Sequence, residues 1–159
     1  MITAWGGDNP LDIFYVDEYT IFMNSAIDRV RAAQMKAFSI RPKVGGFPYI
    51  AEVLRQAGVT HNTWSLPSCQ SIYDLEDESI VQPGIPLVQD MSDIPHFDQD
   101  ALIRSLRADQ AGESTFPEFL RAAWNAGVIW YQVDFLSRKV TYKGARGETY
   151  EESYPEVKV

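Results

Sequence analysis

The sequence contains little of what several protein classes require. Cys69 is the only cysteine, so no disulfide can form within the chain and nothing indicates an oxidising compartment. His61 and His96 are the only histidines, which leaves few nitrogen and sulfur ligands for a metal ion. No stretch approaches the roughly 20 apolar residues that span a bilayer. We therefore expect no metal and no cofactor, and the cytoplasm is the default location.

Positive charge is also scarce. Fourteen Lys and Arg residues stand against 22 Asp and Glu residues, and the net charge is -8. A surface that binds duplex nucleic acid needs clustered cations to neutralise phosphates, and no basic run supplies them. The same negative charge would repel an anionic membrane surface. We expect neither nucleic acid nor a membrane as the partner of this acidic protein.

The chain is large enough to bury a core. Its 159 residues are 45% hydrophobic, and folding of a chain of this size buries roughly 70% of the unfolded surface. Residues 1–22 lack a basic start and carry acids within every apolar run, which is not the pattern of a signal peptide. We interpret residues 1–22 as an N-terminal extension and residues 23–159 as a single domain.

An internal repeat with an offset of 69 residues is the clearest feature. FPYIAEVLRQAGV at residues 47–59 returns as FPEFLRAAWNAGV at residues 116–128, and seven of 27 aligned positions are identical without a gap. We interpret this as a duplication. The two repeats cover about residues 23–80 and 97–156, and an extended proline-containing segment at 81–96 joins them.

Each repeat predicts two helices. In the second copy, Thr115 and Glu118 form the T-x-x-E pattern of a capping box, and Gly127 stands where a left-handed residue ends a helix. Another helix precedes each of these, and we expect Asn24 and Asp98 as the N-caps of those preceding helices.

After each helix-ending glycine the apolar period becomes two, which predicts strands. A two-residue turn at Ser137–Arg138 would place Val133 opposite Tyr142 on an apolar face, and the same register would place Trp64 opposite Tyr73. The predicted fold class is α+β: two copies of a helix-helix-antiparallel β-meander unit related by pseudo-two-fold symmetry. The copies either share one sheet or pack their apolar faces together.

The second copy carries a specific series of motifs, DQAGEST, FPEF, AGV, YQVDF, VTYKG and GETYEESYP. This series resembles the YbcV-like family of small bacterial and phage-type proteins over roughly residues 23–159. The resemblance implies an α+β fold of helices and a sheet, and it implies no activity. Members are often labelled "phage envelope protein". A structural envelope protein would normally offer a membrane segment or a glycosylated secreted domain, so we do not adopt that label.

Catalytic groups are few. A phosphate-binding loop, a dinucleotide fingerprint and a nucleophile elbow are all missing from the sequence. The predicted hairpin register separates Cys69 from His61 by roughly 20 Å, and Cys69 is interpreted as an exposed turn thiol. His96 lies near Asp93, Asp98 and Asp100, the only local cluster of possible metal ligands. The start of a helix accounts for this cluster without a metal, because Asp98 would cap the helix and Asp100 would interact with its dipole. Glu76 would stand opposite His61 on the polar face, where the pair could perform acid-base work, although a solvated edge explains both residues. We lean towards a protein without enzymatic activity.

Aromatic residues supply the other candidate site. Trp130 falls on the polar face of its strand, Tyr131 on the core side, and Trp124 off the main apolar stripe of its helix. Exposed Trp and Tyr side chains are typical anchors of protein interfaces, although a strand or helix could cover these three. We predict a non-enzymatic protein-interaction module, either a homodimer or a protein that binds another protein. The alternative is a small-molecule binder or minor enzyme with a pocket between the two repeats.

Overall fold

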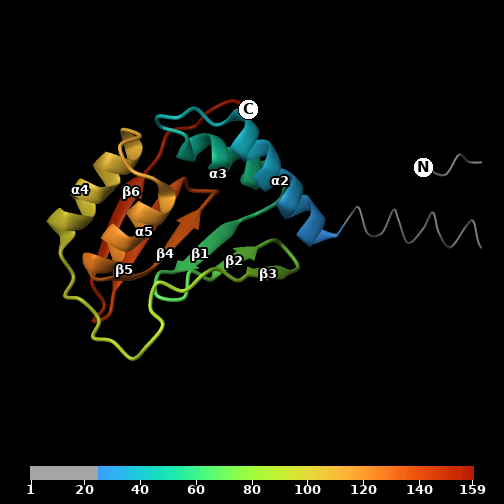
Figure 1. The fold of residues 1–159 in the computed structure, drawn as a ribbon. Coiled ribbons are helices and arrows are strands. Elements are labelled where there is room, and N and C mark those ends of the chain that lie inside the picture. The colour runs from blue at the N-terminus through green and yellow to red at the C-terminus, as the bar shows by residue number, and fades with distance from the viewer. Residues whose placement is uncertain (1–24) are drawn as a thin grey trace, which may run out of the picture.

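The computed structural model describes residues 25–159. In this part of the chain, four helices lie on one face of a six-stranded antiparallel sheet, which confirms the α+β class (Figure 1). The helices are α2 (Ala26–Ile40), α3 (Phe47–Gln56), α4 (Gln99–Gln110) and α5 (Phe116–Asn125). The strands are β1 (His61–Ser65), β2 (Ser71–Asp74), β3 (Ser79–Gln82), β4 (Val128–Asp134), β5 (Lys139–Gly144) and β6 (Thr149–Ser153). The predicted extension at residues 1–22 lies outside the described residues.

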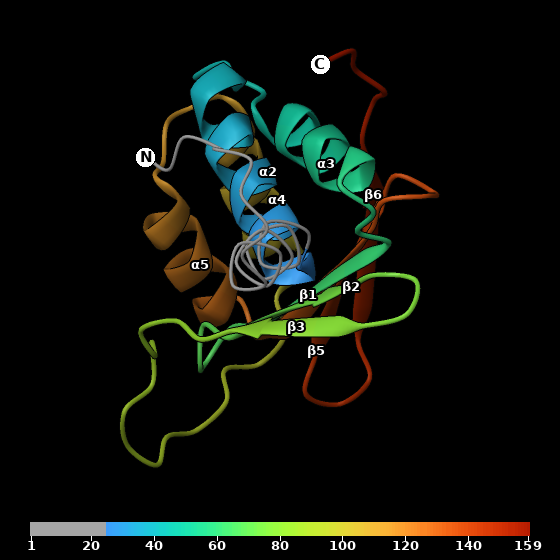
Figure 2. The same cartoon turned by 90° about the vertical axis from the view of Figure 1, so that its right-hand side faces the viewer.

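The chain forms two three-stranded meanders that join edge to edge. The strand order is β3-β2-β1-β4-β5-β6, and β1 pairs antiparallel with β4. The meanders therefore share one sheet and do not pack face to face. At the centre of this ladder Thr63 lies opposite Gln132. Figure 2 shows all four labelled helices on the same side of the sheet, so the opposite face carries no helix from the described residues. We call it the uncovered face.

The helix ends follow the sequence signals closely. The Thr115 side chain accepts a hydrogen bond from the backbone N–H of Glu118, and the Glu118 carboxylate accepts from the Thr115 N–H at 2.7 Å, so the capping box is confirmed. Asp98 caps α4 as predicted. For α2 the cap prediction is wrong: Ser25, and not Asn24, is the N-cap, and its hydroxyl oxygen accepts from the Asp28 N–H at 3.1 Å.

Both hairpin registers differ from the sequence-based prediction by two residues. Tyr142 lies opposite Tyr131 rather than Val133, and Tyr73 lies opposite Asn62 rather than Trp64. A shift of two keeps every side chain on its expected face, because the side-chain period of a strand is two. Tyr131 and Val133 are accordingly buried beneath the helices.

The β4–β5 turn shows why the register moves. The Asp134 carboxylate accepts hydrogen bonds from the backbone N–H groups of Leu136 and Ser137, at 2.9 and 3.0 Å. The Phe135 N–H donates to the carbonyl oxygen of Thr60 instead of pairing with β5. Four residues, 135–138, therefore form the turn instead of two, and Arg138 adopts a left-handed backbone with φ 53°.

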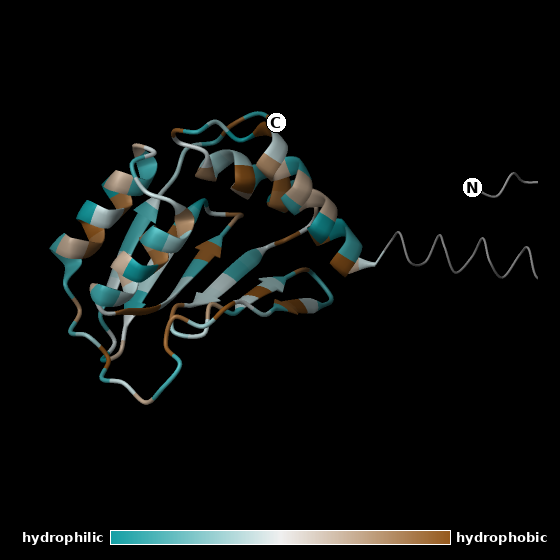
Figure 3. Ribbon diagram, viewed as in Figure 1, coloured by the Kyte–Doolittle hydropathy of each residue, from teal (hydrophilic) through white to brown (hydrophobic). Residues whose placement is uncertain are grey.

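The core lies between the helices and the sheet. Its largest fully buried side chains come from both meanders and from α4, and they are Phe135, Leu66, Leu102, Val59, Val128 and Val133. Figure 3 shows hydrophobic and hydrophilic residues interleaved along the helices and strands, as expected of elements with one buried face.

Residues 83–98, which we call the strap, connect β3 to α4 and are held at both ends. Near the start, the N–H groups of Leu87 and Val88 donate to the carbonyl oxygen of Pro67. Near the end, the Asp98 N–H donates to the carbonyl oxygen of Ala126 at 2.8 Å. These bonds fix the strap against the β1–β2 turn and the α5–β4 junction.

Glycine at position 127 allows the second of these contacts. Gly127 has φ +83°, and a Cβ there would meet the His96 carbonyl oxygen at 2.5 Å. Gly147 has a similar backbone, φ +90°, but a Cβ there would have no neighbour within 4 Å.

We expect Gly127→Ala to destabilise the protein more than Gly147→Ala. Both substitutions carry the left-handed strain of about 1–2 kcal/mol, while Gly127→Ala adds an overpacking cost of about 1–3 kcal/mol. Urea denaturation of the two variants measures the difference directly. Equal losses of stability would show that the strap does not press against residue 127.

Candidate functional site

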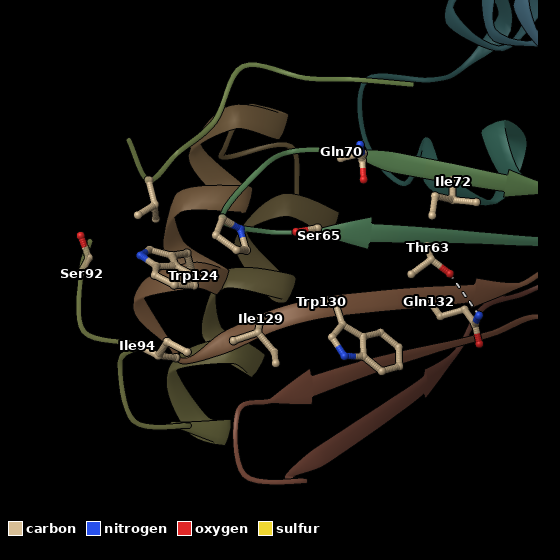
Figure 4. A pocket seen from close by; sticks show the side chains of 12 residues that line it. Thr63, Ser65, Gln70, Ile72, Ser92, Ile94, Trp124, Ile129, Trp130 and Gln132 are labelled. Atoms are coloured by element: carbon tan, nitrogen blue, oxygen red, sulfur yellow. Dashed lines mark hydrogen bonds between the residues drawn. The ribbon is translucent and has the colours of Figure 1, made fainter. Parts of the chain in front are cut away.

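A groove crosses the uncovered face at the junction of the two meanders. It is open to solvent and has a volume of about 630 Å³. Strands β1, β2 and β4 form its floor, and the β1–β2 turn and the strap form its walls (Figure 4). Trp124, in the last turn of α5, also contributes to the lining. We call it the sheet groove, and its lining residues are Thr63, Ser65, Pro67, Gln70, Ile72, Val88, Ser92, Ile94, Trp124, Ile129, Trp130 and Gln132.

The floor carries uncharged polar groups from both meanders. The Gln132 amide Nε2 donates to the Thr63 hydroxyl oxygen at 3.1 Å, which is the dashed line in Figure 4. Ser65 lies directly opposite Trp130, and its hydroxyl oxygen accepts from the Ser68 hydroxyl at 2.8 Å. The floor therefore presents hydroxyl and amide groups that keep part of their hydrogen-bonding capacity.

Two indole rings give the groove its aromatic character. Trp130 rises from β4 and Trp124 from α5, and Figure 4 places Ile129 in the region between them. Both rings are half-buried. The Lys143 ammonium lies 5.4 Å from the centre of the Trp130 ring, a cation–π contact at the margin of the groove. Lys143 is not itself part of the lining.

The lining of the sheet groove contains no Asp, Glu, Lys, Arg, His or Cys side chain. This absence stands out in a chain with 36 charged residues, 22 acidic and 14 basic. Charged and titratable side chains lie beside the lining on the same face. His61 and Asp134 follow Thr63 and Gln132 at a spacing of two on β1 and β4, and they face each other at 3.9 Å. Lys139 and Glu151 form an ion pair at 3.3 Å on the second meander.

Of the three predicted aromatic surface residues, the structure brings two together. Trp124 and Trp130 both line the sheet groove. Tyr131 does not contribute, because its ring is buried beneath the helices between Trp64 and Tyr142. Burial raises the pKa of the Tyr131 phenol well above its ordinary value. Sequence reasoning missed the strap residues of the groove, because no local pattern places a loop against a distant strand.

The structure does not bring His61 and Glu76 together. The corrected register places His61 opposite Asp74 and Asp134, while Glu76 lies in the turn after β2. The His61 Nε2 atom is 3.9 Å from the Asp134 Oδ2 atom, and both side chains are about a third exposed, at 37%. Partial burial alone would raise the pKa of the Asp134 carboxyl. The hydrogen bonds that it accepts from Ser137 and Leu136 have the larger effect, so its pKa is below the ordinary value.

Cys69 is buried, which corrects its interpretation as an exposed thiol. It adopts a left-handed backbone, φ 51°, after the β1–β2 turn, and its thiol contacts the Leu66 carbonyl oxygen at 3.6 Å. Burial raises the pKa of the thiol, which lowers its reactivity as a nucleophile. Within residues 25–159, no group of three or more His, Cys, Asp or Glu side chains could hold a metal ion.

The main polar network on the other face joins α4 to β6. Arg107 donates to the Glu152 carboxylate at 2.6 Å, and the Tyr150 hydroxyl and the Gln110 amide donate to the same carboxylate at 2.6 and 3.2 Å. Partial burial alone would raise the pKa of the Glu152 carboxyl. These hydrogen bonds and the positive charge of Arg107 have the larger combined effect, so its pKa is below the ordinary value. Because its donors occupy the carboxylate, we interpret this network as structural.

Comparison with known proteins places the chain in a family. The uncharacterised proteins Rv2012 of Mycobacterium tuberculosis (strain H37Rv) and Mb2035 of Mycobacterium bovis are each 47% identical to it over 135 residues. The alignment covers 85% of this chain and 82% of each relative. The chain belongs to the same family as these mycobacterial proteins. No family model matches it.

Among residues 25–159, every helix is too short or too polar to cross a bilayer.

We expect Glu152→Gln to cost about 1–2 kcal/mol at neutral pH, because the charge-assisted hydrogen bonds weaken in a partly solvated site. Since the folded pKa is lowered, this contribution is present above the ordinary pKa of 4.5 and is lost as pH falls through the folded value. Urea denaturation between neutral pH and pH about 3 measures it.

The matched control is Glu151→Gln, which removes the neighbouring exposed ion pair with Lys139. We expect a smaller loss of stability from this variant. A loss as large as that of Glu152→Gln, or a Glu152→Gln effect that does not shrink in acid, would contradict the structural role of the network.

Proposed function

We propose that the protein is a non-enzymatic binding module and that the sheet groove is its recognition surface. One observation carries this proposal: two Trp rings and several uncharged polar groups gather in one open groove at the centre of the sheet. Binding sites combine apolar and aromatic walls with a few polar groups that fix the orientation of the ligand. The volume of about 630 Å³ lies within the range of about 300–1,000 Å³ that such sites occupy.

The side chains of the groove support binding rather than catalysis. Among residues 25–159, those that line the groove supply no carboxylate, imidazole, thiol or amine. These are the groups that most often transfer protons or attack carbonyl carbons near neutral pH. The His61–Asp134 pair lies outside the lining and is separated by 3.9 Å.

We also propose that the two meanders, each with its preceding helix pair, descend from one duplicated unit related by pseudo-two-fold symmetry. Thr63 and Gln132, which are 69 positions apart, pair with each other at the centre of the β1–β4 ladder. The left-handed residues Cys69 and Arg138 also differ by 69 positions. The sheet groove would then be the pocket between two repeats.

Reciprocal hydrogen bonds give this proposal further support. The Leu66 N–H donates to Ile129, and the Phe135 N–H donates to Thr60, so each bond maps onto the other under the offset of 69. A crystal structure in which the two halves do not superpose with that offset would contradict the duplication. Membership of the YbcV-like family stays a prediction.

The proposed function predicts that ligands perturb the groove and not other surfaces. Two-dimensional NMR of the full chain, labelled with ¹⁵N, would be recorded against a panel of neutral, anionic and cationic small molecules and short peptides. We expect the shifted signals to cluster at the backbone of β1, β2 and β4 and at the Trp124 and Trp130 indoles. Shifts confined to other surfaces, or none at millimolar ligand, would contradict the proposal.

A protein partner is the second candidate, and the strap favours it. Ile85 and Met91 are 85% and 102% exposed, and exposed apolar side chains beside a groove are typical of interfaces. We expect a homodimer in this case, so that sedimentation velocity would show association that increases with concentration. The double variant Ile85→Ser/Met91→Ser should abolish it, while Met35→Ser on α2, which is 75% exposed, should not. A monomer at every concentration would exclude self-association.

A further inference from the structure

We propose that the sheet groove binds a neutral carbohydrate, a short oligosaccharide whose rings pack on Trp124 and Trp130. This inference deepens the proposed function and rests on the sheet groove being the recognition surface. The chemical class follows from three properties of the lining: its charge, its polar groups and its aromatic rings.

The absence of charged side chains from the lining disfavours an ionic ligand. An anionic ligand would lose part of its hydration in the groove, and the lining has no cation to replace the lost water. The net charge of -8 on the chain would also repel it. A cationic ligand would find no carboxylate in the lining. Burial of an unpaired charge is costly in either case. A neutral ligand avoids both costs.

The polar groups of the floor exclude a purely apolar ligand. Thr63 accepts from Gln132 and keeps its own O–H as a donor, while Gln132 keeps its carbonyl oxygen and a second N–H. Ser65 accepts from Ser68 and also keeps its O–H. An apolar ligand would cover these groups and leave them unsatisfied, at a cost of about 1–3 kcal/mol each. A ligand with several hydroxyl groups supplies both donors and acceptors.

The indole rings complete the argument. A pyranose ring has an apolar face of C–H groups and an edge of hydroxyl groups. The C–H face can pack on the apolar face of Trp124 or Trp130, while the hydroxyl edge reaches the amide and hydroxyl groups of the floor. The Lys143 ammonium lies over the Trp130 ring, so a sugar that packs on Trp130 either displaces this ammonium or takes the other face of the indole. A neutral saccharide satisfies all three properties of the groove together.

The test compares trisaccharides that differ in charge. The neutral probes are cellotriose, maltotriose and chitotriose, the anionic probe is trigalacturonate, and the cationic probe is the chitosan trimer. Each is titrated into the ¹⁵N-labelled full chain while the amide and indole signals are followed. We expect at least one neutral trisaccharide to shift the signals of the sheet groove, and to bind at least tenfold more tightly than both trigalacturonate and the chitosan trimer.

Variants locate the site. We expect Trp130→Ala to weaken binding of the neutral trisaccharide at least tenfold, whereas Lys143→Gln should not weaken it, because the Lys143 ammonium competes with the sugar for the Trp130 ring. Phe38→Ala is the matched aromatic control and should leave binding unchanged, because Phe38 is exposed on α2, in the helical layer and away from the sheet groove. Gln132→Ala removes a polar group of the floor, and it serves as the second test if Trp130→Ala does not give a folded spectrum.

Each alternative outcome has a defined meaning. If none of the neutral trisaccharides shifts the groove but a peptide or another small molecule does, the carbohydrate inference is overturned and the proposed function stands. If trigalacturonate binds more tightly and Lys143→Gln weakens it, the ligand is anionic and the inference is also overturned. Shifts confined to another surface, or none with any probe of the larger panel, would overturn both.

Discussion

The antiparallel ladder between β1 and β4 is the interaction on which the rest of the structure depends. It joins the two meanders into one sheet, so that only β3 and β6 remain as edges. It also sets which side chains meet at the centre, because a register that pairs Thr63 with Gln132 brings residues of both meanders onto one floor. A shift of one residue would exchange the two faces and move Tyr131 and Val133 out of the core.

The strap converts this floor into a groove, and small residues decide where it lies. A Cβ on Gly84 would collide with the Cys69 carbonyl oxygen, and a Cβ on Gly127 would meet the His96 carbonyl oxygen at 2.5 Å. The backbone therefore approaches closely at both ends of the strap. Between these anchors Ser92 and Ile94 contribute to the wall. The site depends on backbone contacts between segments that are distant in the sequence.

This dependence explains which features the sequence could predict. The capping box at Thr115 and Glu118 is local, and the alternation along β4 is local, so the start of α5 and the face of Trp130 followed from the pattern. The register did not, because the Phe135 N–H bonds to Thr60 across the sheet and the Asp134 carboxylate widens the turn. The burial of Cys69 and the meeting of Trp124 with Trp130 likewise arise only after the strands and the strap assemble.

Charged groups of the uncovered face lie around a neutral lining. Lys139 and Glu151 on the outer strands, and His61 and Asp134 on the central strands, are partly exposed and lie close to each other in pairs, which is the ordinary composition of a solvated sheet surface. At the centre the lining is neutral although the chain is strongly acidic. Stability alone does not require this, because charged side chains would stay solvated in the groove as long as no ligand covers them. The neutral lining supports the proposed neutral ligand, since a ligand that covered an unpaired charge in the lining would bind against the cost of desolvating that charge.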